Sequence, residues 1–321
     1  MDGITDLGGD VFEIDTLMGG YTGITAGYLI RSDRPCLVET GTSLSAPTVV
    51  AALHSLGIDP ADLATVVVTH IHLDHAGGVG DIAAAFPNAQ IVCHERGARH
   101  LADPTKLVAS AHRVFGPVME ELFGDLKPTK AERIVALGDV GSIDLGAGRR
   151  LDAFHAPGHA SHHLGLLDST TGDLYTGDAA GVYVPESDEL RPATPPPDFD
   201  LDLALASMGK MREVAPERLL FSHYGPVREV DSALDRSEAV LREWVDLVRQ
   251  ARTMQMDLDH AVAMVRERTP VDIPDDPEFD VRREAWETLS STAANVAGIS
   301  RWLDKSEGPG STSGDAASVA R

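Results

Sequence analysis

The chain has 321 residues, 43% of them hydrophobic and 24% charged, a composition that excludes a fibrous or wholly disordered protein. Its formal net charge of -23 repels phosphate backbones and anionic lipid headgroups, so we expect neither nucleic acid nor a membrane as a partner. The acidic N-terminus has no secretory-signal pattern, and no apolar run is long enough to span a bilayer. Only two cysteines, Cys36 and Cys93, are present, which excludes a disulfide scaffold, and we expect a cytoplasmic protein.

Strands and helices are expected to mix along the first 130 residues. Two short apolar runs separated by a turn, at residues 26–30 and 36–39, predict a hairpin. Apolar residues at helical spacing predict a helix over residues 46–56, with Ser45 as its N-cap. The β-branched run at residues 63–69 is typical of a strand buried on both faces of a sheet. The elements expected after it are a helix at 81–86, a strand at 90–93 and a mostly helical stretch at 95–130.

The character of the chain changes after residue 230. The elements expected before it are strands within 133–155, paired strands at 164–167 and 174–176, a Pro-rich loop at 192–197, a helix at 201–214 and a strand at 218–222. The spacing of apolar residues after it predicts helices at 232–252, 257–268 and 279–303. We therefore expect three parts, which are an α/β domain over 1–230, a C-terminal helical extension over 231–306 and a disordered tail rich in Gly and Ser over 307–321.

A dense cluster of metal-binding residue types follows the predicted buried strand. His70, His72, Asp74 and His75 lie within six positions, directly before a glycine-rich turn. Alternation along an extended chain sends His70 and His72 to one side, and the turn lets the other two face the same space. Imidazole nitrogen and carboxylate oxygen are ligands that borderline divalent metals prefer. Four such groups indicate two ions. A His-rich surface turn is the disfavoured alternative, because the chain has only 13 histidines.

The pattern HxHxDH after a buried strand resembles the signature of the metallo-β-lactamase-fold hydrolases, among them the glyoxalase II type. Later elements of that family occur here in the same order. They are a PGH element ending at His159, a TGD element ending at Asp178, and a terminal GHG-type element around His223 in which Ser222 and Tyr224 replace the glycines. The resemblance implies an α/β fold, the four-layer αββα metallo-β-lactamase sandwich, here with a helical insert and a C-terminal helical extension.

The resemblance also implies a dinuclear metal centre held by seven side chains. The ligands implied are His70, His72 and His159 for the first ion, Asp74, His75 and His223 for the second, and Asp178 as a bridge between the two. In that family a hydroxide shared by the two metals attacks the scissile bond. Asp74 is then the catalytic group that passes a proton to the leaving group. Zinc is favoured, with iron or manganese as alternatives, because all the ligands are nitrogen or oxygen.

The substrate implied is a small molecule with an ester-like bond, either a thioester or a lactone. The predicted C-terminal helices resemble those of a quinolone-signal thioesterase of this superfamily, where they cap the cleft. They are equally consistent with a homodimer interface. The alternatives are a phosphodiesterase of the same fold and a di-iron redox or regulatory protein with little hydrolytic turnover. A β-lactamase is disfavoured, because many of those enzymes depart from a second site that contains a carboxylate.

Several side chains near the motifs are candidates for supporting roles. Glu39 stands where the family usually has Asp, and a hydrogen bond to the metal loop is expected. His162 and His163 follow the PGH element as supporting or surface groups. Tyr183 and Tyr224 could donate a proton to an oxyanion, although packing roles are favoured. Structural or surface roles are also favoured for the remaining histidines, which are His54, His94, His100, His112, His155 and His260.

Overall fold

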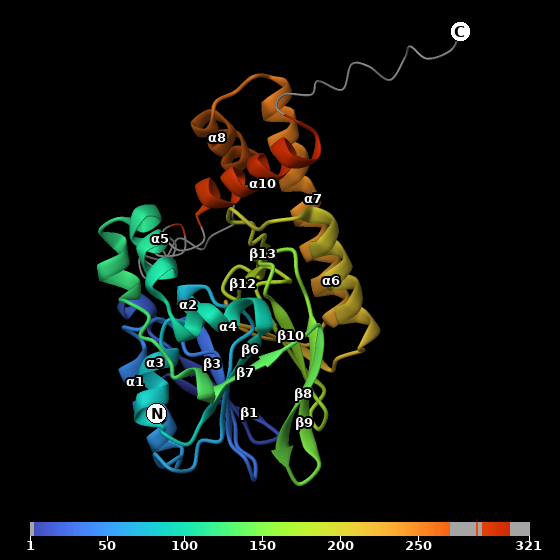
Figure 1. Cartoon of the computed structure of the whole chain (residues 1–321). Coiled ribbons are helices and arrows are strands. Elements are labelled where there is room, and N and C mark those ends of the chain that lie inside the picture. Colours follow the sequence, from blue (N-terminus) through green and yellow to red (C-terminus); the bar gives the residue numbers. More distant parts are fainter. Residues whose placement is uncertain (1–2, 270–286, 288–290, 309–321) are drawn as a thin grey trace.

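Two β-sheets packed face to face form the centre of the protein, and helices cover the outer face of each sheet (Figure 1). This computed structural model describes residues 3–269, 287 and 291–308. The predicted tail beyond residue 308 lies outside the described residues. So do residues 279–286 and 288–290, which belong to the last predicted helix.

The first sheet has seven strands in chain order. They are β1 (Ile4–Gly8), β2 (Val11–Asp15), β3 (Ala26–Ile30), β4 (Cys36–Val38), β5 (Thr65–Val67), β6 (Gln90–His94) and β7 (Ile134–Leu137). The first four are antiparallel, and β4 to β7 are parallel because helices connect them. The predicted hairpin is confirmed as β3 and β4. The predicted buried strand is confirmed as β5, which is buried along its length.

The second sheet has six strands in the order β15-β14-β11-β10-β9-β8. The strands are β8 (Val140–Gly146), β9 (Arg149–His155), β10 (Leu164–Asp168), β11 (Asp173–Gly177), β14 (Arg218–Phe221) and β15 (Gly225–Val227). The predicted pairing of 164–167 with 174–176 is confirmed by the antiparallel pair β10 and β11. Between β11 and β14, which are parallel, the chain forms a small hairpin of β12 (Val182–Val184) and β13 (Glu189–Arg191).

Helices form the two outer layers. Those between strands of the first sheet are α1 (Ala46–Ser55), α2 (Leu73–Ala76), α3 (Val79–Ala85), α4 (Glu95–Ala102) and α5 (Thr105–Phe115), with short helical turns at Met18–Gly20, Met119–Phe123 and Ala131–Arg133. The helices associated with the second sheet are α6 (Leu201–Glu213), α7 (Val230–Thr253), α8 (Leu258–Arg268) and α10 (Thr292–Ser306). Among the described residues, no helix combines the length and the apolar character that a membrane span requires.

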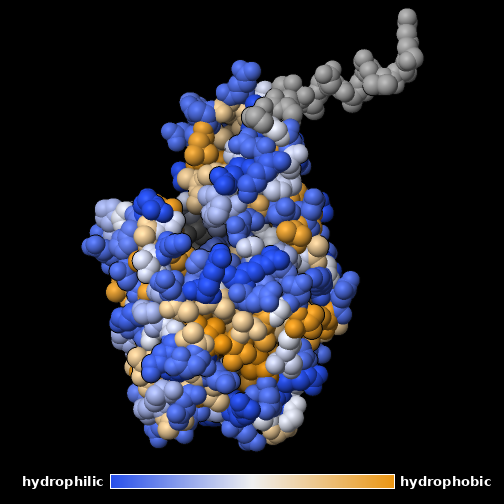
Figure 2. Space-filling view, in the orientation of Figure 1, coloured by the Kyte–Doolittle hydropathy of each residue, from blue (hydrophilic) through white to orange (hydrophobic). Residues whose placement is uncertain are grey.

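Three apolar clusters hold these layers together. One lies between the sheets and includes Tyr28 and Leu220. A second joins the first sheet to α1 and α3, and a third joins the second sheet to α6, α7, α8 and α10. This order of helix, sheet, sheet and helix is the predicted αββα sandwich. At the edge strands β7 and β8 an apolar patch reaches the surface, and Val140 of β8 is 81% exposed (Figure 2).

Two local predictions need correction. Strands β1 and β2 were not expected, because Glu13 and Asp15 interrupt the apolar pattern of β2 although both are buried. Burial, reinforced by Asp15, raises the pKa of Glu13 to about 7. Ser45 precedes α1 but makes no capping hydrogen bond, and its hydroxyl contacts Thr42 instead. Pro47 in the first turn lacks an amide hydrogen, which removes one donor that a cap could bind.

Candidate metal centre

The seven predicted ligands come from four loops that follow strands of both sheets. His70, His72, Asp74 and His75 lie between β5 and the end of α2, while His159 follows β9. Asp178 directly follows β11 and His223 lies two residues after β14, and these strands are the parallel pair of the second sheet. Because the ends of parallel strands meet at one edge of a sheet, loops that are far apart in sequence are brought together there.

Three imidazoles form the first triad. His72 Nδ1 lies 3.1 Å from His70 Nε2 and 2.9 Å from His159 Nε2. All three nitrogens could hold one metal ion. In tetrahedral coordination with bonds of about 2.0–2.1 Å, two ligand atoms are about 3.3 Å apart, so this spacing is close to that around a bound zinc-sized ion.

The second triad consists of one carboxylate and two imidazoles. His223 Nε2 lies 3.2 Å from His75 Nε2 and 3.4 Å from Asp74 Oδ2. Asp178 lies between the triads. Its Oδ1 is 3.3 Å from His75 Nε2, and its Oδ2 is 3.6 Å from His159 Nε2. One carboxylate thus turns one oxygen to each triad, which is the arrangement of a bridging ligand.

The outward-facing nitrogens of these rings are held by acceptors. His159 Nδ1 lies 2.9 Å from the carbonyl oxygen of Ala193, and His223 Nδ1 lies 2.9 Å from that of Ile24. A neutral ring that donates from Nδ1 presents the lone pair of Nε2 to the centre. Lone pairs facing one another at about 3 Å repel unless a cation lies between them, so the donor set fits divalent metal ions.

The electrostatics of the first triad agree with this donor set, whereas Asp178 and Asp74 raise the pKa of His75 and His223 in the second triad. Burial lowers the pKa of His70, His72 and His159, that of His72 to about 3. These rings are therefore neutral at physiological pH, which is the form that binds a metal. Burial alone would raise the pKa of Asp178, but the neighbouring imidazoles, led by His75, hold it well below its usual range. The bridging position thus carries a negative charge.

Glu39 and His163 are not ligands themselves but contact the residues that carry the ligands. Glu39 Oε1 accepts a hydrogen bond of 2.8 Å from the Thr69 amide, and Oε2 lies 3.2 Å from His75 Nδ1. His163 is fully buried, and its Nε2 accepts a hydrogen bond of 3.1 Å from the Asp178 amide. A Cβ at Gly177, where φ is +49°, would lie 2.5 Å from His163 Nε2. The glycine of the TGD element therefore lets the ring reach the backbone of the bridging residue.

We expect the Glu39→Gln variant to bind metal about 10–100-fold more weakly than the wild type. Glutamine keeps an oxygen for the Thr69 amide but removes the negative charge beside His75. The measurement is competition for zinc against a chelator of known affinity, with the exposed Glu95→Gln as a matched control. Equal affinities in both variants would contradict a supporting role for Glu39.

The hydroxyls of the two tyrosines contact carboxylates other than the predicted ligands. The hydroxyl of Tyr183 donates to Asp188 at 3.2 Å, and that of Tyr224 lies against the carboxylates of Glu13 and Asp15. The favoured packing interpretation therefore agrees with their positions. His162 is partly buried and contacts the ligand loop through the Ile71 amide at 3.4 Å.

One contact that the sequence did not suggest joins the last helix to the centre. The Thr194 amide donates to Asn295 Oδ1 of α10 at 2.6 Å, next to the Ala193 carbonyl that holds His159. A Cβ at Gly298 would lie 1.8 Å from the Thr194 oxygen, so only glycine allows α10 to approach this loop. The C-terminal helices are thereby connected to a predicted ligand through two residues.

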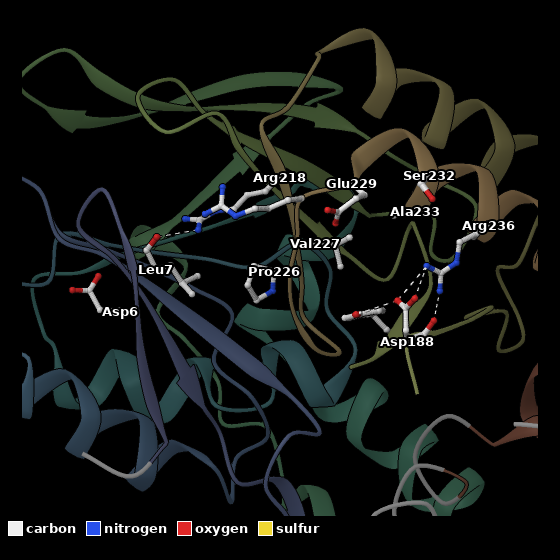
Figure 3. A pocket seen from close by; sticks show the side chains of 12 residues that line it. Asp6, Leu7, Asp188, Arg218, Pro226, Val227, Glu229, Ser232, Ala233 and Arg236 are labelled. Carbon is white, nitrogen blue, oxygen red and sulfur yellow. Dashed lines mark hydrogen bonds and ion pairs between the residues drawn. The ribbon is translucent and has the colours of Figure 1, made fainter. Parts of the chain in front are cut away.

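One large pocket among the described residues does not include the centre. It measures about 620 Å³ and is lined by polar groups that include Arg218, Asp188 and Arg236 (Figure 3). None of the seven predicted ligands lines it. A smaller cavity of about 20 Å³ borders His159 and Asp178, with room for about one water. Proximity to the ligands, rather than volume, therefore identifies the candidate site.

Fold and donor set together define the class, which is an αββα sandwich whose clustered His and Asp side chains could hold divalent metals. The chain belongs to the metallo-β-lactamase superfamily, because the model of that family matches residues 20–223. Proteins of this fold are generally hydrolases that bind divalent metals.

The sequence identity between this chain and individual relatives is low. Over 165 residues the chain is 29% identical to the metallo-β-lactamase fold-containing protein ST1585 of Sulfurisphaera tokodaii, covering 50% of this chain and 60% of that protein. Over 182 residues it is 29% identical to an N-acyl homoserine lactonase of Bacillus thuringiensis, covering 54% and 61%. The crystal structure of ST1585 superposes with a TM-score of 0.65 at 20% identity, over 90% of this chain and 97% of that one. The matched sequences thus span about three fifths of these two relatives.

Proposed function

We propose that the chain is a dinuclear metal-dependent hydrolase that cleaves the ester-like bond of a small molecule, a lactone or a thioester. The observation that carries the proposal is the pair of ligand triads joined by the two oxygens of Asp178. The similarity to N-acyl homoserine lactonases supports an ester-like substrate and favours a lactone. Zinc is the metal we propose, because the donors are nitrogen and oxygen at distances suited to tetrahedral coordination.

Bound metal ions would supply a water with a pKa lowered toward neutrality and would polarise the oxygen of the scissile bond. His70, His75, His159, Asp178 and His223 are buried. His72 and Asp74 are the partly exposed members of the set, so the substrate reaches the centre over these two side chains.

Asp74 is placed to move a proton. Its side chain is 18% exposed, and its Oδ2 faces His223 Nε2 at 3.4 Å. Burial alone would raise the pKa of Asp74, but His75 and His223 lower it below its usual range. The carboxylate is therefore ionised at neutral pH, and one of its oxygens would be free to take up a proton from a water held at the centre. Passing that proton to the leaving group is the role that we propose for Asp74.

The test is metal content by elemental mass spectrometry, together with turnover on four compounds. These are an acyl homoserine lactone, an acyl thioester, an aryl phosphodiester and a β-lactam. We expect at least two zinc ions per chain and turnover of the lactone or thioester that is lost on chelation and restored by zinc. Fewer than one metal per chain, or turnover that survives chelation, would contradict the proposal.

A second candidate is a di-iron redox protein. It is favoured by 24% identity over 257 residues, which are 76% of this chain and 40% of the relative, to a putative diflavin flavoprotein of Thermosynechococcus vestitus. Two iron ions per chain, with no turnover on the four compounds and reoxidation of the reduced centre by oxygen, would support this candidate over hydrolysis.

A further inference from the structure

A second group of metal-binding side chains lies outside the seven-residue centre. It consists of His94 at the end of β6, Asp139 in the turn between β7 and β8, and His155 at the end of β9. One atom from each residue lies within 4.8 Å of the other two. The group therefore connects the first sheet, the turn that leads to the second sheet, and the second sheet itself (Figure 1).

The distances match those around one metal ion. Asp139 Oδ1 lies 3.2 Å from His155 Nδ1 and 3.6 Å from His94 Nε2. Ligand atoms bound tetrahedrally to zinc at about 2.0–2.1 Å are about 3.3 Å apart. The two rings stack at 4.5 Å with an angle of 17° between their planes, and one nitrogen of each ring faces Asp139 Oδ1.

His155 is oriented as a metal ligand. Its Nε2 lies 3.0 Å from the carbonyl oxygen of Ser161, which holds the ring hydrogen on that nitrogen. Nδ1 then presents a lone pair to the Asp139 carboxylate. Two electron-rich atoms at this distance need a proton or a metal ion between them, and a carbonyl that orients the ring is the usual support of a histidine ligand.

His94 supplies the independent observation. Its side chain is buried, and within the described residues Nε2 has no hydrogen-bond partner although it faces Asp139. Burial and the neighbouring His155 lower its pKa, which keeps the ring neutral. Ligation through Nε2 would place the ring hydrogen on Nδ1 and end a contact of 3.3 Å from the Arg96 amide. That contact is at the long end for a hydrogen bond, so its loss is small beside a metal bond.

We propose that His94, Asp139 and His155 form a separate mononuclear site for a divalent cation of the zinc type, completed by water. Nearby positive groups do not occupy it. Arg96 binds the Ser161 carbonyl, and Lys210 binds the carbonyl of His155. Asp139 is 74% exposed, so the site opens to solvent on one side and a metal can enter. A bound ion would fix the edges of the two sheets to each other.

Asp139→Asn is the variant that tests this site, because the exposed side chain can change without disturbing the core. Asp125→Asn is the matched control, since Asp125 is 65% exposed and pairs with a single histidine, His112, at 2.8 Å. The proteins are loaded with zinc, freed of excess by gel filtration and analysed for zinc per chain. We expect one zinc ion fewer in Asp139→Asn than in the wild type and in Asp125→Asn, whatever the total.

Anomalous diffraction at the zinc absorption edge gives the second measurement. The proposal requires a peak between His94 Nε2 and His155 Nδ1 in wild-type crystals and its absence in crystals of Asp139→Asn. Equal zinc content in all three proteins, or no peak at this position, overturns the proposal. Neither outcome depends on hydrolysis, so the separate site and the proposed function succeed or fail independently.

Discussion

Replacing Asp178 by asparagine is expected to reduce the metal content by at least one ion per chain and to reduce hydrolysis by more than about 100-fold. The carboxylate offers Oδ1 to the second triad and Oδ2 to the first. Asparagine has one oxygen and an NH₂ group whose hydrogens repel a cation, so it cannot bridge two ions. The loss of metal affinity and of activity should exceed the 10–100-fold loss that is typical when a residue that only supports a ligand is replaced, because here a direct ligand is removed.

The measurement combines elemental analysis of the purified variant with kcat/KM on the substrate that the wild type hydrolyses. Circular dichroism shows whether the variant is folded, which is needed because Asp178 is buried. Full occupancy by two ions with wild-type turnover would exclude a bridging role. Loss of metal in a folded variant would support it.

For Asp74→Asn we expect the first triad to keep its ion while turnover falls by about 10²–10⁴-fold, the range for loss of a general acid or base. The amide cannot accept the proton that the Asp74 carboxylate receives in the proposed mechanism. The first triad is unaffected, because Asp74 is not one of its ligands, which are His70, His72 and His159. Asp74 belongs to the second triad, in which it contacts His223 and His75.

Asp59→Asn, at an exposed turn, is a suitable control. Proton transfer and metal binding can be separated by repeating the assay with saturating zinc. Turnover restored to the wild-type rate by zinc would show that Asp74 serves only as a ligand. A deficit that persists at full occupancy would support the proton-transfer role.

Local sequence determined much of this protein. The β-branched run before His70 predicted β5, and the glycine and proline positions predicted the turns that carry His159 and Asp178. The order of these motifs indicated the αββα fold, because it resembles the order in the metallo-β-lactamase family, where each motif follows a strand. The seven predicted ligands lie together in the structure for the same reason. Strands β1 and β2 were missed because buried carboxylates hide the strand pattern of β2.

Contacts between distant segments were decided only by the tertiary structure. Nothing near Asn295 suggests a metal centre, yet α10 packs against the loop that holds His159. His94, Asp139 and His155 belong to no common motif, and their side chains meet only because β6 and β9 end beside the turn between the sheets. A sequence pattern shows which side chains lie close together within one segment, but not which other segment they will face. The packing of two sheets determines which segments face one another, because burying both apolar faces fixes their register and orientation.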